Sequence, residues 1–123
     1  MKPSLRVRLI EFIKKESYNI VNHANPAYRT MLYMAFGTLL RYIENASEEE
    51  LRDFIKDLVS KKEEIYALLE QAKEGKLEVK DAKLKRIYPY LQQMLKKEDN
   101  IIKRIVDDFF REFEDEVKDS KDG

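Results

Sequence analysis

The chain has 123 residues, 39% of them charged, and its 24 basic and 24 acidic residues leave no net charge at pH 7. A balanced charge does not favour a polyanion as partner, and the absence of cysteine excludes disulfides, thiol catalysis and cysteine-based zinc sites. Having only three glycines and three prolines favours long helices. We expect an all-α protein with one helical domain over residues 1–118 and a frayed tail over 119–123.

The N-terminal segment MKPSLRVRLIEFIKK is basic, but charged residues interrupt its apolar positions. A secretory signal has an unbroken apolar stretch, so the expected location is cytoplasmic. Heavy use of Lys and Glu without Cys is compatible with a thermophilic source.

The first predicted helix begins after Ser4, whose hydroxyl can cap it, and runs to about Asn22 with apolar residues along one face. The connector that follows holds His23, the only histidine of the chain. A lone histidine in a connector is expected to be exposed or to cap a helix rather than to catalyse a reaction.

The segment from Asn25 to Ile43 contains eleven consecutive uncharged residues, enclosed by Arg29 and Arg41. Asn25 and Pro26 suit the start of a helix. One face of this helix is formed by Tyr28, Leu32, Ala35, Leu39, Tyr42 and Ile43. A helix that is apolar over most of its circumference belongs in the interior, so the sequence predicts a buried central helix over about 26–44. The run is too short for a membrane span, which needs about 20 apolar residues.

The next helix has a clear predicted start, because Ser47 and Glu50 have the spacing of a capping box. An apolar stripe from Leu51 to Leu69 predicts a single helix that ends near Lys73.

Two glycines have specific predicted roles. Gly37 lies inside the predicted central helix, where it costs about 1 kcal/mol relative to alanine, so close approach of another backbone would explain it. Gly75 follows the third helix and suits the left-handed conformation past a helix end.

The last part of the chain is expected to begin with a short helix that Asp81 caps and Pro89 interrupts. From Pro89 the apolar period continues to about Lys118, and it does not slip across the candidate break Lys96–Asn100. This favours one long, kinked helix. The predicted fold is therefore a helical bundle of four main helices plus a short fifth.

Charge alternates along the chain in four blocks: +4 over residues 1–36, −4 over 37–72, +5 over 73–97 and −5 over 98–123. Segments of opposite sign can attract one another within a chain or between chains. Solvated helix faces that happen to cluster are the simpler explanation.

Apolar residues cover about half of the circumference of the predicted last helix, more than the width of about 100° that one core requires. We therefore expect a homodimer through this helix. The predicted interface comprises Ile102, Val106, Phe109, Phe110, Phe113 and Val117. Alternatively, the first helix covers this surface within one chain.

A basic segment over residues 80–104 is the alternative functional surface, suited to an RNA- or DNA-binding accessory subunit. Basic side chains beside an aromatic ring can follow a phosphate backbone and stack a base. The candidate residues are Lys80, Lys83, Lys85, Arg86, Tyr90, Lys97 and Arg104. Against this, Asp108 and Asp115 are expected to pair with Arg104 and Arg111 along the helix.

A lesser alternative is a Mg²⁺-dependent hydrolase. The candidate pairs of carboxylates, one helical turn apart, are Glu50 with Asp53, Glu112 with Asp115, and Glu116 with Asp119. Their spacing resembles that of the Mg²⁺ ligands in helical nucleotide pyrophosphohydrolases. Such pairs also arise by chance in a chain this charged. The sequence thus favours a non-enzymatic interaction or assembly module that is homodimeric and has no cofactor, no metal and no membrane partner.

Overall fold

The computed structural model describes residues 3–122, and the side chains of these residues as far as Glu116. Along this part of the chain run six helices and no strand. They are α1 (Leu5–Asn22), α2 (Pro26–Asn45), α3 (Glu48–Ser60), α4 (Lys62–Lys73), α5 (Ala82–Lys96) and α6 (Ile101–Asp122). The all-α prediction is confirmed for the described residues, with six helices in place of four main helices and a short fifth.

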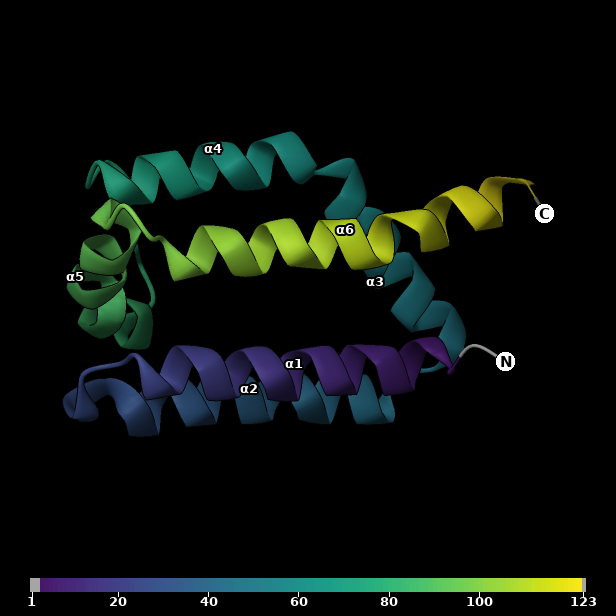
Figure 1. Ribbon diagram of the computed structural model, residues 1–123, viewed down its shortest axis with the longest axis horizontal. Coiled ribbons are helices and arrows are strands. Elements are labelled where there is room, and N and C mark those ends of the chain that lie inside the picture. The colour runs from purple at the N-terminus through teal and green to yellow at the C-terminus, as the bar shows by residue number, and fades with distance from the viewer. Residues whose placement is uncertain (1–2, 123) are drawn as a thin grey trace.

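Helix α6 lies in the middle of the molecule. Figure 1 shows it between α4 on one side and the antiparallel pair α1–α2 on the other, with α3 and α5 at the two ends. Helix α1 packs on α2, α3 on α6, and α4 on α5. The most deeply buried side chains include Phe113 of α6, Leu9 of α1 and Leu51 of α3, each exposed by 1% or less. The core is therefore built around α1, α3 and α6.

The prediction of a buried central helix over 26–44 is wrong for the single chain. Helix α2 buries only Leu32 and Ile43, while Ala35 is exposed and Met34 is 59% exposed. The helix lies at the edge of the molecule and packs chiefly on α1 (Figure 1). The apolar periodicity correctly predicts that this segment is a helix, but the burial of the helix depends on how many other helices pack on it.

The predicted helix starts are confirmed by side-chain hydrogen bonds. Ser4, Asn25 and Asp81 each accept from backbone N–H groups two or three residues further along. The capping box is complete, since the Ser47 hydroxyl accepts from the Glu50 N–H and the Glu50 carboxylate accepts from the Ser47 N–H, both at 3.0 Å. These bonds satisfy N–H groups that a helix start would otherwise leave free.

A single helix from Ser47 to Lys73 was predicted, but the structure divides it. The Ser60 hydroxyl donates to the Asp57 carbonyl at 2.7 Å, and Lys61 leaves the helical conformation with φ −102° and ψ 17°. This turn changes the direction of the chain, so that α3 lies across one end of the molecule whereas α4 runs lengthwise beside α6 (Figure 1).

The predicted continuity from Pro89 to Lys118 is also wrong, because residues 97–100 separate α5 from α6. The Asn100 side chain stabilises this break by hydrogen bonds to the backbone of both helices. Its Oδ1 accepts from the Lys103 N–H and its Nδ2 donates to the Leu95 carbonyl, both at 3.1 Å. Helix α6 then continues to Asp122, into the predicted tail, of which Gly123 lies outside the described residues.

Pro89 does not interrupt its helix as predicted but lies inside α5. The carbonyl of Lys85 is the group that loses its helical donor there. Both residues are exposed, so water can satisfy that carbonyl. Among residues 3–122, no helix combines the length and the hydropathy that crossing a membrane requires.

Candidate protein-docking surface

The predicted dimer interface on α6 lies mostly inside the chain. Phe110 and Phe113 are 3% and 0% exposed. Ile102, Val106 and Phe109 are half-buried, and the side chain of Val117 lies outside the described residues. Phe110 and Phe113 are therefore covered within the single chain, while Ile102, Val106, Phe109 and Phe110 also line the two hollows described below. The homodimer through this helix stays a prediction.

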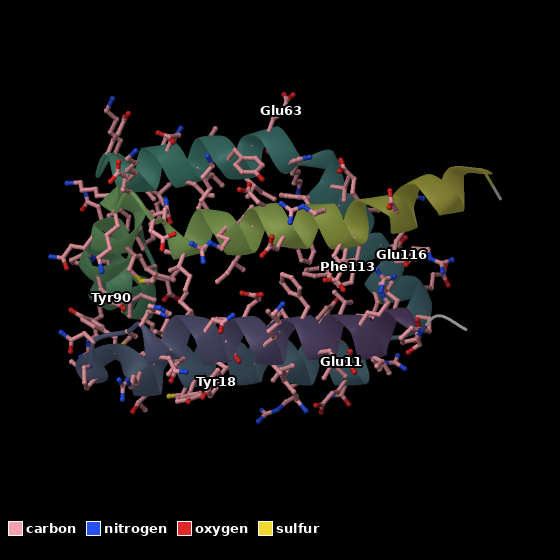
Figure 2. All side chains as sticks on the ribbon, viewed as in Figure 1. Glu11, Tyr18, Glu63, Tyr90, Phe113 and Glu116 are labelled. Carbon is pink, nitrogen blue, oxygen red and sulfur yellow. The ribbon has the colours of Figure 1, made fainter. Side chains whose placement is uncertain are left out.

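Helix α1 covers part of this surface, in line with the alternative prediction. The Phe12 ring meets the rings of Phe109 and Phe113 edge-on, at centroid distances of 5.8 and 5.7 Å. The Arg8 guanidinium lies 5.1 Å from the centre of the Phe113 ring and forms an ion pair with Glu116. Figure 2 shows Phe113 between α6 and α1. Helix α1 thus covers part of the apolar surface of α6, and the remainder lines the two hollows described next.

The apolar surface that remains uncovered lies between α2 and α4, on opposite sides of the molecule (Figure 1). Helix α4 buries none of its residues. Two apolar hollows of about 320 and 280 Å³ adjoin in this region, and Phe36 lines both. We call them together the apolar groove. Its walls and ends include Leu32, Phe36, Leu39 and Ile43 of α2, Phe54 and Leu58 of α3, Ile65, Leu69 and Ala72 of α4, and Leu84, Leu91 and Leu95 of α5.

The two ends of the apolar groove carry opposite charge. Helix α3, at one end, has five acidic and two basic residues, whereas α5, at the other end, has four basic residues and no acidic one. Asp53 and Asp57 directly precede the groove-lining Phe54 and Leu58 at the first end, and Lys83 and Lys85 flank Leu84 at the second; all four charged residues are exposed. A partner with the reverse polarity would fit both ends.

The residues of the predicted nucleic-acid surface are only partly brought together. Lys80, Lys83, Lys85, Arg86 and Lys97 are all exposed. Tyr90 is stacked on Tyr28 with ring centroids 4.8 Å apart, and its hydroxyl donates to the His23 carbonyl at 3.2 Å. Burial raises the pKa of the Tyr90 hydroxyl. Because Tyr28 occupies one face of the Tyr90 ring, the stacking platform expected beside these cations is largely used within the chain.

The break before α6 separates Arg104 from the cations of α5. The Arg104 guanidinium pairs with Asp99, not with Asp108 as the helical spacing predicted. Asp108 instead pairs with Arg111, at 3.1 Å. Both arginines therefore have carboxylate partners in the chain.

The paired carboxylates are dispersed. Hydrogen bonds with Ser47, above all the one from its backbone, lower the pKa of Glu50, and Glu116 pairs with Arg8. Glu112 and Asp115 are exposed, while the side chain of Asp119 lies outside the described residues. In the part of the chain with described side chains, no three His, Asp or Glu residues gather in a way that could hold a metal ion.

His23 ends α1 as its C-cap, and its side chain is exposed, as predicted. Its Nδ1 lies 2.7 Å from the Asn19 carbonyl oxygen. The contact ties the ring to the end of its own helix.

A hollow of about 640 Å³ lies where α4 approaches the α5–α6 break, and no motif in the sequence predicts it. Lys73, Lys96, Lys97 and Lys103 line it together with two glutamates and Asn100. Both polar atoms of the Asn100 side chain hydrogen-bond the chain's own backbone, so Asn100 does not offer a donor to a ligand. The hollow is therefore a surface of mixed charge and not a preformed anion-binding site.

The chain matches no protein-family model, no curated protein and no solved structure. Its function is therefore inferred from the surfaces described above.

Proposed function

We propose that the protein is a non-enzymatic, cytoplasmic interaction or assembly module that docks a protein partner in the apolar groove. The observation that carries this proposal is the groove itself, two adjoining hollows lined almost wholly by apolar side chains and open in the folded chain. Large contiguous apolar patches are rare on monomeric proteins and mark interaction sites.

The total accessible surface supports the same proposal. The chain exposes 8638 Å², whereas a compact monomer of its mass, 14.7 kDa, exposes about 6,900 Å². A standard protein–protein interface removes about 800 Å² from each partner. Half of the excess would therefore supply a full interface.

The structural contacts of the ionisable groups considered above favour a non-enzymatic role. Glu50 serves a helix cap, Glu116 holds Arg8, and His23 ends a helix. Each of these groups has a structural partner in place of a reacting one.

The test is site-specific photo-crosslinking in cells. A benzoylphenylalanine at Ala35, which is exposed and shares a face of α2 with the groove-lining Leu32 and Leu39, should crosslink to a protein partner. The control position is Tyr18 of α1, which is 66% exposed and points away from α6 (Figure 2). We expect adducts from Ala35 and none from Tyr18.

The captured partner, once identified and purified, should bind the wild-type chain and the Tyr18→Glu variant equally. It should bind the Ala35→Glu variant at least about tenfold more weakly, because a buried unpaired carboxylate costs more than 1.4 kcal/mol. Equal adducts from both positions, or none from Ala35, would refute the proposal.

A second candidate function is RNA or DNA binding by the cations around the start of α5, which are all exposed. Binding through phosphates would fall steeply with salt. Labelled single-stranded RNA that shows no salt-dependent binding to the wild-type chain removes this candidate.

A further inference from the structure

We infer that the partner in the apolar groove is a second copy of this chain, placed so that the acidic α3 end of each copy lies against the basic α5 end of the other. This inference rests on the proposed function of the groove as a protein-docking surface. The resulting dimer has a two-fold axis that runs across the groove in the plane of contact.

The charges at the groove ends identify the occupant. A partner must present a positive end to α3 and a negative end to α5, with an apolar surface between them. The groove face of this chain has that composition in the reverse order. Since the two-fold axis exchanges the ends, the separation of the charges on one copy necessarily equals the separation on the other.

The charge pattern also selects one of two orientations. A face-to-face dimer can place its axis along the groove, which sets α3 on α3 and α5 on α5. Like charges would then meet at both ends, which is unfavourable. With the axis across the groove, α3 meets α5 twice, while the apolar α2 meets its own copy. The second orientation is therefore the one we assign.

The charges at the two ends of the groove are only partly paired within the chain. Among the described residues, no ion pair joins the basic block 73–97 to an acidic block, and Lys76 pairs only with Glu74 beside it. At the α3 end Asp57 pairs with Lys61, and both side chains are more than half exposed. At the same end Glu48 pairs with Arg6 at 3.4 Å. Asp53, Lys83 and Lys85 take part in none of these ion pairs, so α3 keeps an acidic balance and α5 a basic one for a partner.

The test uses charge reversal in the full chain, with mass measured by light scattering and affinity by sedimentation equilibrium. One variant reverses the acidic end (Asp53→Lys with Asp57→Lys), a second reverses the basic end (Lys83→Glu with Lys85→Glu), and a third carries all four changes. The control variant reverses two exposed acids that do not line the groove, Glu11→Lys with Glu63→Lys; Glu63 points away from α6 (Figure 2). Circular dichroism verifies that each variant is folded.

Wild type and the control variant should be dimers. Each double reversal changes the sign of interactions at both ends, so self-association should weaken by at least about tenfold. The fourfold variant restores opposite charges and should dimerise like wild type at the same salt concentration. An equal mixture of the two double variants should also form dimers.

Other results would overturn the inference. A monomeric wild type removes the second copy as occupant, and if Ala35 then crosslinks to a different protein the proposed function still stands. A wild-type dimer that both double variants retain, or that the fourfold variant fails to restore, rules out this orientation. A monomer that binds labelled RNA and loses this binding in the Lys83→Glu, Lys85→Glu variant assigns the basic end to a nucleic acid.

Discussion

Replacing Gly37 by alanine should stabilise the protein. Gly37 is an exposed residue within α2, and a Cβ atom built on it meets nothing within 4 Å. Alanine removes the glycine penalty of about 1 kcal/mol in a helix interior. For 123 residues, the entropy of unfolding is about 0.26 kcal/mol/K, so the melting temperature should rise by about 4 °C.

The same substitution at Gly75 should have the opposite effect and serves as the matched comparison. Gly75 has φ +76°, a left-handed conformation, and a Cβ there would lie 2.9 Å from Nε2 of Gln92. That amide donates to the Lys73 carbonyl at 3.2 Å, so it cannot move away without losing its hydrogen bond. The left-handed conformation alone costs about 1–2 kcal/mol for alanine, and the melting temperature should fall by about 4–8 °C.

Thermal unfolding followed by circular dichroism decides both values, and light scattering of each variant monitors its mass. Gly37 does not line the apolar groove, so Gly37→Ala should leave the mass unchanged. A lower melting temperature or a smaller mass for Gly37→Ala would mean that another backbone approaches this position. That result would refute the placement of this face of α2 against solvent.

Three further substitutions test other parts of the structure. Ser47→Ala should cost about 1 kcal/mol in urea unfolding. An NMR titration should show the pKa of Glu50 rising only part of the way back, because alanine keeps the backbone N–H that is the main cause of the lowering. The variant should therefore lose less stability than wild type as pH falls below the ordinary value of 4.5. Burial of the Tyr66 hydroxyl, and then its hydrogen bond to Asp107, raises the pKa of Tyr66 to about 12. The raised pKa contributes stability to the folded protein that is complete below about pH 10 and is lost as pH rises to about 12. The wild type should therefore lose more unfolding free energy than Tyr66→Phe between about pH 9 and pH 11.5, and equal losses would contradict the assignment. Phe110→Glu buries a carboxylate at a position that is 3% exposed, so it should lower the unfolding free energy by about 3 kcal/mol or more; a folded, soluble monomer would show that Phe110 is an interface residue after all.

Features set by neighbouring residues could be predicted from the sequence. Ser4, Asn25, Ser47 and Asp81 cap helices because the acceptor and the N–H groups lie within three residues of each other. Gly75 takes the left-handed conformation past the end of α4 for the same local reason. None of these features requires knowledge of the tertiary fold.

The break between α5 and α6 could not be predicted from periodicity. Leu95 and Ile102, on the two sides of the break, are seven residues apart, which is close to two helical turns. The apolar phase is therefore the same for a continuous helix and for two helices joined by residues 97–100. The local signal that was missed is Asn100, which caps the start of α6 through the Lys103 N–H.

The sequence could not show which of the two helices with broad apolar faces, α2 or α6, would be the buried one. Both α2 and α6 have broad apolar faces, but α6 lies between α1 and α4 (Figure 1), so Phe110 and Phe113 are covered. Helix α2 is packed chiefly by α1, and part of its apolar face remains in the open groove. The excess apolar surface therefore lines the groove, to which α2 and α4 contribute together with Ile105, Val106 and Phe109 of α6.

A second copy in the groove would change the meaning of the α2 pattern. Leu39, now half-buried, and the exposed Ala35 would face the same helix of the other copy and become interior. The prediction of a buried helix over 26–44 would then describe the assembly, because selection acts on the environment that a residue has in its functional state. Amide hydrogen exchange in α2 distinguishes the two cases, since exchange through a dissociated state slows as protein concentration rises, whereas exchange of a helix at the edge of a monomer does not.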